Sequence, residues 1–292
     1  MAVPEGPERD HGEVHFFRPW PKFPSISITG TKCALMCKYC RGFYLKGMLQ
    51  AERPGELWEL CSSLARKGVK GVLISGGFTK DGVLPIRPFL RTIRAIKEQL
   101  GLLVAVHPGL VDEELAQELA SAGVDVALFD VVGDEKTIRD VIGLRRKPED
   151  YLASLMALRE TGLRVAPHVC LGIHGGELRG EAEALKIVRS VGADVLVIII
   201  FMPTRGTPFQ DASPPSLEEL KPVMAEARGM FEGIPVALGC MKPRERPYRT
   251  ALEAMALELG FDRMALPARE TVDRARTFGL KIVWHDVCCA LP

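Results

Sequence analysis

The chain has 292 residues, of which 47% are hydrophobic and 26% are charged, as is typical of a globular protein. Because 38 Lys and Arg residues balance 37 Asp and Glu residues and no long basic run occurs, charge gives no indication of nucleic-acid binding. The apolar run at 193–203 is too short to cross a bilayer and residues 1–14 contain no apolar signal-peptide core, so we expect a cytoplasmic protein without membrane contact.

Short apolar runs alternate with amphipathic segments along nearly the whole chain. Predicted strands, rich in Val, Ile and Leu as buried parallel strands are, occupy 25–30, 71–75, 102–107, 124–131, 163–171, 194–202, 235–239 and 263–266. Their alternation with predicted helices indicates an α/β protein with a TIM-type (β/α)8 barrel. We expect a single domain over 1–292, with an N-terminal arm at 1–24 and a short C-terminal extension at 268–292. An open doubly wound sheet is the alternative.

Unusual residues follow these predicted strands. Active sites of (β/α)8 barrels lie on the loops after the carboxyl ends of the strands. In chain order these positions hold Cys33, Cys37 and Cys40, then Gly76 and Gly77, His107, Asp130, Gly172 and Cys240. The chemistry is therefore expected on one face of the barrel.

Eight cysteines in a cytoplasmic protein do not predict a disulfide framework. Cys33, Cys37 and Cys40 have the spacing C-x3-C-x2-C, and thiolates suit zinc, copper(I) and iron–sulfur clusters. Three thiolates are one short of the closed shell of a structural zinc site, but on a 4Fe–4S cluster they leave one iron open to a substrate or cofactor. Three ordinary buried thiols, or a zinc site completed by a distant His, are the alternatives.

The cysteine spacing, with Tyr39 just before the last cysteine, resembles the signature of the radical S-adenosylmethionine (radical SAM) superfamily. The resemblance implies that Cys33, Cys37 and Cys40 ligate a 4Fe–4S cluster whose open iron binds S-adenosylmethionine. It also implies reductive cleavage of that cofactor to a 5′-deoxyadenosyl radical, which takes a hydrogen atom from an unactivated carbon. The electron would come from a donor such as ferredoxin or flavodoxin.

The same resemblance implies further contacts with the cofactor. Gly76 and Gly77 correspond to a Gly-Gly-Glu segment that receives the methionine amino group, although Phe78 here replaces the acid. Tyr39 would lie near the adenine, and Asp130 near the ribose. Gly172 would belong to a glycine-rich turn on the adenine side. A strand-end cap at Asp130 and an ordinary tight turn at Gly172 are the structural alternatives.

The last third of the chain resembles biotin synthase. Segment 201–209 contains a P-x-x-GTP turn, and Cys240 stands where biotin synthase supplies a ligand to its second, sulfur-donating cluster. With the terminal pair Cys288 and Cys289, Cys240 would hold an auxiliary iron–sulfur cluster that acts in catalysis as the sulfur donor. Alternatively, Cys240 packs as a small hydrophobic residue and the terminal pair is incidental.

The segments FDVVGDEKTIRDVIGL and LGCMKPR, with the terminal cysteine pair, resemble the biotin-synthase-like subunits of a two-protein lipoyl synthase. This implies a sulfurtransferase that inserts sulfur into a lysine-bound octanoyl chain and acts with a second radical SAM subunit. One alternative is a radical SAM mutase, methylating or ring-forming enzyme without sulfur insertion. Another is a non-catalytic iron–sulfur or zinc protein.

Four other residues are candidates without a defined role. His168 and Cys170 lie two residues apart on a predicted strand and therefore share a face, either in the substrate cavity or in the core. His107 and His174 lie at predicted strand ends, where they are candidates for contact with substrate or nucleotide.

Overall fold

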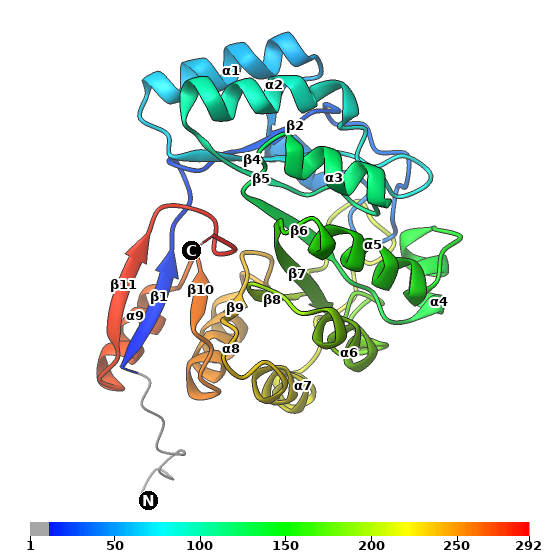
Figure 1. The fold of residues 1–292 in the computed structure, drawn as a ribbon. Helices are drawn as coiled ribbons and strands as arrows, with labels where there is room; N and C mark the ends of the chain where they lie inside the picture. The colour runs from blue at the N-terminus through cyan, green and yellow to red at the C-terminus, as the bar shows by residue number, and fades with distance from the viewer. Residues whose placement is uncertain (1–11, 292) are drawn as a thin grey trace, which may run out of the picture.

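The computed structural model describes residues 12–291, in which a curled parallel sheet is covered on its outer face by helices (Figure 1). The strands are β1 (Glu13–Phe17), β2 (Ser25–Ser27), β3 (Leu49–Gln50), β4 (Gly71–Ser75), β5 (Leu103–Val106), β6 (Val126–Asp130), β7 (Arg164–Leu171), β8 (Leu196–Ile200), β9 (Val236–Leu238), β10 (Arg263–Ala265) and β11 (Lys281–His285). Their order across the sheet is β11-β1-β10-β9-β8-β7-β6-β5-β4-β2-β3. The described part of the sheet is open, with β11 and β3 at its edges.

Helices connect successive parallel strands, as parallel pairing requires. They are α1 (Pro54–Arg66), α2 (Leu90–Ala95), α3 (Glu113–Ser121), α4 (Glu135–Thr137), α5 (Pro148–Glu160), α6 (Glu181–Val191), α7 (Leu217–Met230), α8 (Arg246–Glu258) and α9 (Arg269–Thr277), with short helical turns η1 (Phe43–Gly47), η2 (Arg87–Phe89), η3 (Ile96–Leu100) and η4 (Ile138–Ile142). Local capping fixes several starts, as where the Ser216 hydroxyl accepts from the Glu219 backbone N–H at α7. Within residues 12–291, no helix combines the length and apolar character that a membrane span needs.

All eight predicted strands are present, and the expected TIM-type architecture is confirmed. Two further strands lie in segments that the sequence analysis assigned to the N-terminal arm and the C-terminal extension. β1 pairs with β10 on one side and with β11 on the other, and Glu13 stands opposite Lys281. The sheet thus joins the two ends of the described chain.

Side chains on the two faces of the sheet form two apolar cores. Along β8, Leu196, Ile198 and Ile200 pack toward the helices, whereas Val197 and Ile199 point into the curl. The segment after β11 also enters the curl, where Val287, Ala290 and Leu291 pack in the inner core. The Arg263 guanidinium holds this segment by donating to the carbonyls of Cys289 at 2.9 Å and Leu291 at 2.5 Å.

A buried carboxylate ties the loop after β9 to the helices behind it. Glu253 of α8 is 0% exposed and accepts from Arg249 Nε at 2.9 Å, Thr271 Oγ1 at 2.5 Å and the Ala268 backbone N–H at 2.7 Å. Its Oε1 also lies 3.4 Å from Lys242 Nζ, which is itself only 3% exposed. Removing the carboxylate would leave a buried ammonium without its counter-charge.

We therefore expect Glu253→Gln to lower the free energy of unfolding by about 3–5 kcal/mol, the usual cost of breaking a buried ion pair. Urea unfolding followed by circular dichroism measures this change. The matched control is Glu258→Gln on the same helix, because Glu258 pairs with Arg274 at the surface. That exposed pair contributes at most about 1 kcal/mol, so equal losses in the two variants would contradict the assignment.

Candidate active site

A cavity of about 440 Å³ lies inside the curl of the sheet, at the carboxyl ends of the strands. Seven of the eight cysteines line it: Cys33, Cys37, Cys40, Cys170, Cys240, Cys288 and Cys289. The eighth, Cys61, is buried in α1 on the outer side of the sheet, and burial raises the pKa of its thiol to about 12. The structure therefore brings together both cysteine sets that the sequence singled out.

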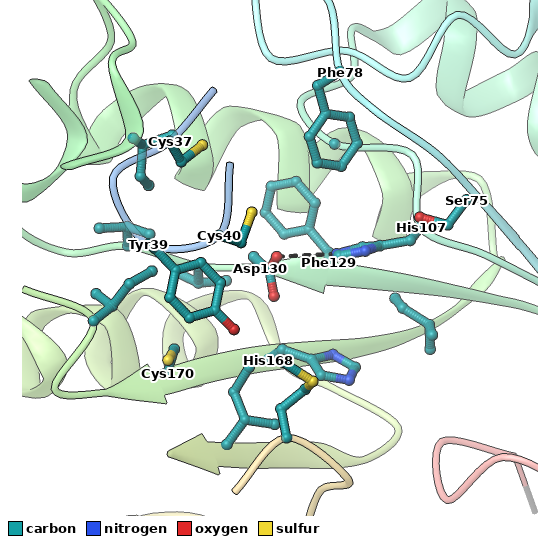
Figure 2. A pocket seen from close by; sticks show the side chains of 18 of the residues that line it. Cys37, Tyr39, Cys40, Ser75, Phe78, His107, Phe129, Asp130, His168 and Cys170 are labelled. Carbon is teal, nitrogen blue, oxygen red and sulfur yellow. Dashed lines mark ion pairs between the residues drawn. The ribbon is translucent and has the colours of Figure 1, made fainter. Parts of the chain in front are cut away.

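The first three cysteines lie on the loop after β2. Its backbone turns tightly, because the Cys37 carbonyl accepts from the N–H groups of both Cys40 and Arg41, at 3.2 and 3.0 Å. Met36 and Arg41 have positive φ angles of 46° and 45°, which non-glycine residues rarely adopt. The thiols of Cys37 and Cys40 are drawn on this loop in Figure 2.

Burial raises the pKa of both Cys37 and Cys40, and the neighbouring thiols raise it further. Thiols in apolar surroundings stay protonated unless a cation stabilises the thiolate form. Binding of a metal provides such a cation and deprotonates them. The donor set and its surroundings therefore fit a thiolate-bound metal cofactor. Among residues 12–291, no three His, Cys, Asp or Glu side chains are arranged to hold one metal ion. The ligands of a cluster bind different irons and need not converge on one point.

The glycine pair after β4 packs directly against the cysteine loop. A Cβ atom on Gly77 would lie 1.9 Å from the Lys32 carbonyl oxygen and 2.5 Å from Cys33 Cα, so only glycine fits there. The Gly77 N–H donates to Thr29 Oγ1 at 2.6 Å, which fixes the segment in place. Gly76 lines the cavity, whereas Gly77 supports the loop from behind.

Three neighbouring strands place a charged group in the middle of the cavity. β6, which ends at Asp130, lies between β5, which is followed by His107, and β7, which carries His168; Figure 2 shows Asp130 paired with His107. Asp130 Oδ2 is 3.1 Å from His107 Nε2, and the two imidazole rings are 6.2 Å apart. The Asp130 side chain is 49% exposed, and it lines the cavity.

The two histidines have opposite electrostatic environments. Burial lowers the pKa of His107, but the charge and hydrogen bond of Asp130 outweigh it, so the pKa lies above its ordinary value. At His168 the effect of burial is larger than that of the Asp130 charge, and the pKa falls to about 4. Burial raises the pKa of Asp130 while His107 lowers it, and the net shift is downward. At neutral pH Asp130 is an anion and His168 is neutral.

Aromatic residues and a further thiol form the wall beside this group. The Tyr39 ring lies 5.9 Å from that of Tyr44 and 6.3 Å from that of Phe201, and burial raises the pKa of Tyr39. Cys170 lines the cavity together with His168, which settles the face that these two residues share. Both point inward from β7.

The second cysteine set enters the cavity from two places in the fold. Cys240 follows β9, and Cys288 and Cys289 follow β11. The hydrogen bond from the neighbouring Cys289 thiol lowers the pKa of Cys288. Burial raises the pKa of Cys240, and Cys288 is close enough to add to the effect.

In the turn after β7, Ile173 lines the cavity, but its neighbours Gly172 and His174 do not. Gly172 is not among the lining residues, and a Cβ atom there would meet Pro215 at 2.4 Å. Its N–H donates to Glu181 Oε1 at 2.9 Å. His174 does not line the cavity, and its Nδ1 lies 2.9 Å from Thr137 Oγ1.

Sequence reasoning missed several polar and sulfur-containing lining residues. Among them are Arg179, just before α6, Glu181, the first residue of α6, and Met241. The glycine-rich turn just before α6 and the neighbouring Cys240 were signals that could have identified them.

Replacing Asp130 by Asn should lower the pKa of both histidines. The Asp130 charge raises the pKa of each, so without it burial alone would bring His107 below its ordinary value of 6.5 and His168 below about 4. An NMR pH titration of the imidazole resonances measures both shifts. Asp140→Asn, at a surface aspartate paired with Arg139, should leave them unchanged. An unaltered His107 pKa in Asp130→Asn would contradict the ion pair.

A family model and individual relatives were compared with this chain, and they agree on one superfamily. The model of the Radical SAM superfamily matches residues 27–191, more than half of the chain. A biotin synthase from Marinobacter nauticus is 28% identical over 250 residues, which cover 79% of this chain and 66% of the relative. A 3-methylornithine synthase from Methanosarcina barkeri is 25% identical over 212 residues, which cover 69% and 57%. The chain thus spans between 57% and 66% of the length of these two relatives.

Solved structures share the fold. A crystal structure of methylornithine synthase superposes with a TM-score of 0.65 at 17% identity, covering 93% of this chain and 84% of the other. A radical SAM methyltransferase from Sphaerobacter thermophilus gives a TM-score of 0.56 at 18% identity over 76% of this chain and 65% of the other. With the family match over more than half of its length, this chain belongs to the radical SAM superfamily.

Proposed function

We propose that this radical SAM enzyme inserts sulfur into an unactivated C–H bond of an aliphatic chain, with a lysine-bound octanoyl group on a protein or peptide as substrate. The observation that supports this proposal is the meeting of two cysteine sets, Cys33–Cys40 and Cys240 with Cys288 and Cys289, at one cavity. Sulfur insertion needs a radical generator and a sulfur source within reach of the same carbon. Similarity to a biotin synthase supports the same chemistry.

Membership of the superfamily implies a 4Fe–4S cluster and S-adenosylmethionine as cofactors. In our proposal Cys33, Cys37 and Cys40 hold the cluster, because all three line the cavity and burial keeps the thiols of Cys37 and Cys40 neutral unless a metal compensates for their charge. When bound, these cofactors supply a radical that removes a hydrogen atom from the substrate. The loop that carries the thiols is held rigid by Gly77 behind it.

The remaining residues of the site would bind and orient the cofactor. Gly76 lines the cavity beside the cysteine loop and offers backbone carbonyls to an amino group. Asp130, kept ionised by His107, can accept hydrogen bonds from ribose hydroxyls. Tyr39 offers an apolar ring to the adenine, and Gly172 would act only by shaping the turn ahead of α6.

The second cysteine set would hold an auxiliary iron–sulfur cluster, whose chemistry is to supply the sulfur atom. Cys240, Cys288 and Cys289 would be its ligands, and the apolar wall around Leu128, Val197 and Ile199 suits an aliphatic chain. Such a wall also excludes water from a reactive carbon radical. The proposal includes a cytoplasmic setting, an electron donor such as ferredoxin or flavodoxin, and a second radical SAM subunit.

A second candidate function keeps the radical chemistry and omits the sulfur. Similarity to a 3-methylornithine synthase favours this alternative, in which the enzyme would be a mutase, a methylating or a ring-forming enzyme with one cluster. The terminal cysteines would then be packing residues.

Replacing Cys33, Cys37 or Cys40 by Ala should abolish reductive cleavage of S-adenosylmethionine, because a cluster with two thiolate ligands loses its open iron site or dissociates. Chromatographic quantification of 5′-deoxyadenosine measures the reaction after anaerobic reconstitution. Cys61→Ala is the matched control, since Cys61 lies in α1 away from the cavity, and it should retain cleavage. Wild-type rates in any of the first three variants would refute the ligand assignment.

The triple variant Cys240→Ala, Cys288→Ala, Cys289→Ala should keep the first cluster and uncoupled cofactor cleavage. It should lose about half of its iron, from about eight to about four atoms per chain, if both clusters are cubanes. Iron analysis and mass spectrometry of an octanoyl-lysine peptide measure the two losses. A wild type with about four irons, or an unchanged iron content in the variant, would favour the enzyme without sulfur insertion.

A further inference from the structure

A second, smaller cavity adjoins the active site behind Cys240. It has a volume of about 260 Å³ and is lined by Cys240, Lys242, Arg244, Arg249 and Leu266. Cys240 also lines the main cavity and is therefore part of the wall between the two. No acidic side chain lines this second cavity.

The cationic side chains around it are only partly neutralised. Glu253 accepts from Arg249 and lies within ion-pair distance of Lys242, so one carboxylate serves two cations. Arg244 has neither a hydrogen bond nor an ion pair with any residue in the described part of the chain. Three cations and one carboxylate leave an excess of two positive charges at the cavity.

The arrangement of these cations is fixed by the backbone. The Arg249 guanidinium donates to the carbonyl of Leu266, whose φ of 51° is unusual for a non-glycine residue. Lys242 Nζ donates to the carbonyls of Ala265 at 2.5 Å and Gly239 at 3.3 Å. Two of the three cations are thus held at the cavity, while Arg244 is exposed and free to meet a ligand.

Lys242, Arg249 and Arg244 together carry more positive charge than Glu253 neutralises, so the potential at the cavity attracts an anion. Guanidinium groups bind planar anions through paired hydrogen bonds. We propose that the second cavity binds a small monovalent anion beside Cys240. A carboxylate and a hydrosulfide ion share the required charge and size. The sulfur-insertion proposal does not require this site, and the site does not depend on that proposal.

Calorimetric titration of the purified, cluster-containing protein tests the inference without S-adenosylmethionine, reductant or turnover. The probes are sodium acetate, sodium hydrosulfide and neutral acetamide, under anaerobic conditions in a bulky sulfonate buffer without added chloride, because chloride would compete for a site of this kind. The variants are Arg244→Gln, which removes the unpaired charge, and Arg244→Lys, which keeps it. Arg246→Gln is the matched control, because Arg246 pairs with Glu270 at the surface and does not line the cavity.

At least one anion should bind to the wild type and to Arg246→Gln, and acetamide should not. Arg244→Gln should weaken that binding by about tenfold or more, as expected for the loss of a charge-assisted contact, and Arg244→Lys should restore most of it. Acetate alone would identify a carboxylate site, and hydrosulfide alone a site for inorganic sulfur. Equal binding by acetamide, or binding that Arg244→Gln leaves unchanged, would overturn the proposal. Failure of either kind leaves the sulfur-insertion tests unaffected.

Discussion

Parallel strand pairing is the constraint on which the site depends. Because every strand runs in the same direction, all carboxyl ends meet at one edge of the sheet, and the loops that follow them share one space. The cysteine loop after β2, Asp130 at the end of β6 and Cys240 after β9 are far apart in the sequence but line the same cavity. An antiparallel sheet with short hairpins would have divided these loops between two edges.

The cavity combines groups that would be unstable there alone. Seven thiols, an aspartate and several apolar walls share one cavity, where apolar surroundings disfavour an isolated charge. His107 lowers the pKa of Asp130, whereas no cation among residues 12–291 lowers the pKa of Cys37 or Cys40. The protein therefore balances the negative charge of Asp130 with a histidine. The negative charge of the Cys37 and Cys40 thiolates has to be balanced by a metal cofactor.

The sequence predicted the eight central strands because each apolar run is followed by a helix of regular period. It did not reveal β1, β3 and β11. β3 has only two residues, and β1 and β11 are partly exposed strands that pair with each other from opposite ends of the described chain. Cysteine spacing identified the first ligand set from local sequence. The burial of Lys242 and Glu253 had no local signal, because both residue types are usually exposed and only tertiary packing brings them together.

The position of β1 has a consequence for the order in which the sheet is assembled. β1 precedes every other strand in residues 12–291, yet its two neighbours in the sheet are β10 and β11. Contacts of such long sequence separation form late, because a large loop must close before they contribute. Neither edge of β1 has its native partner until residues 263–285 have been made. The segment that follows β11 and completes this pairing also brings Cys288 and Cys289 into the cavity.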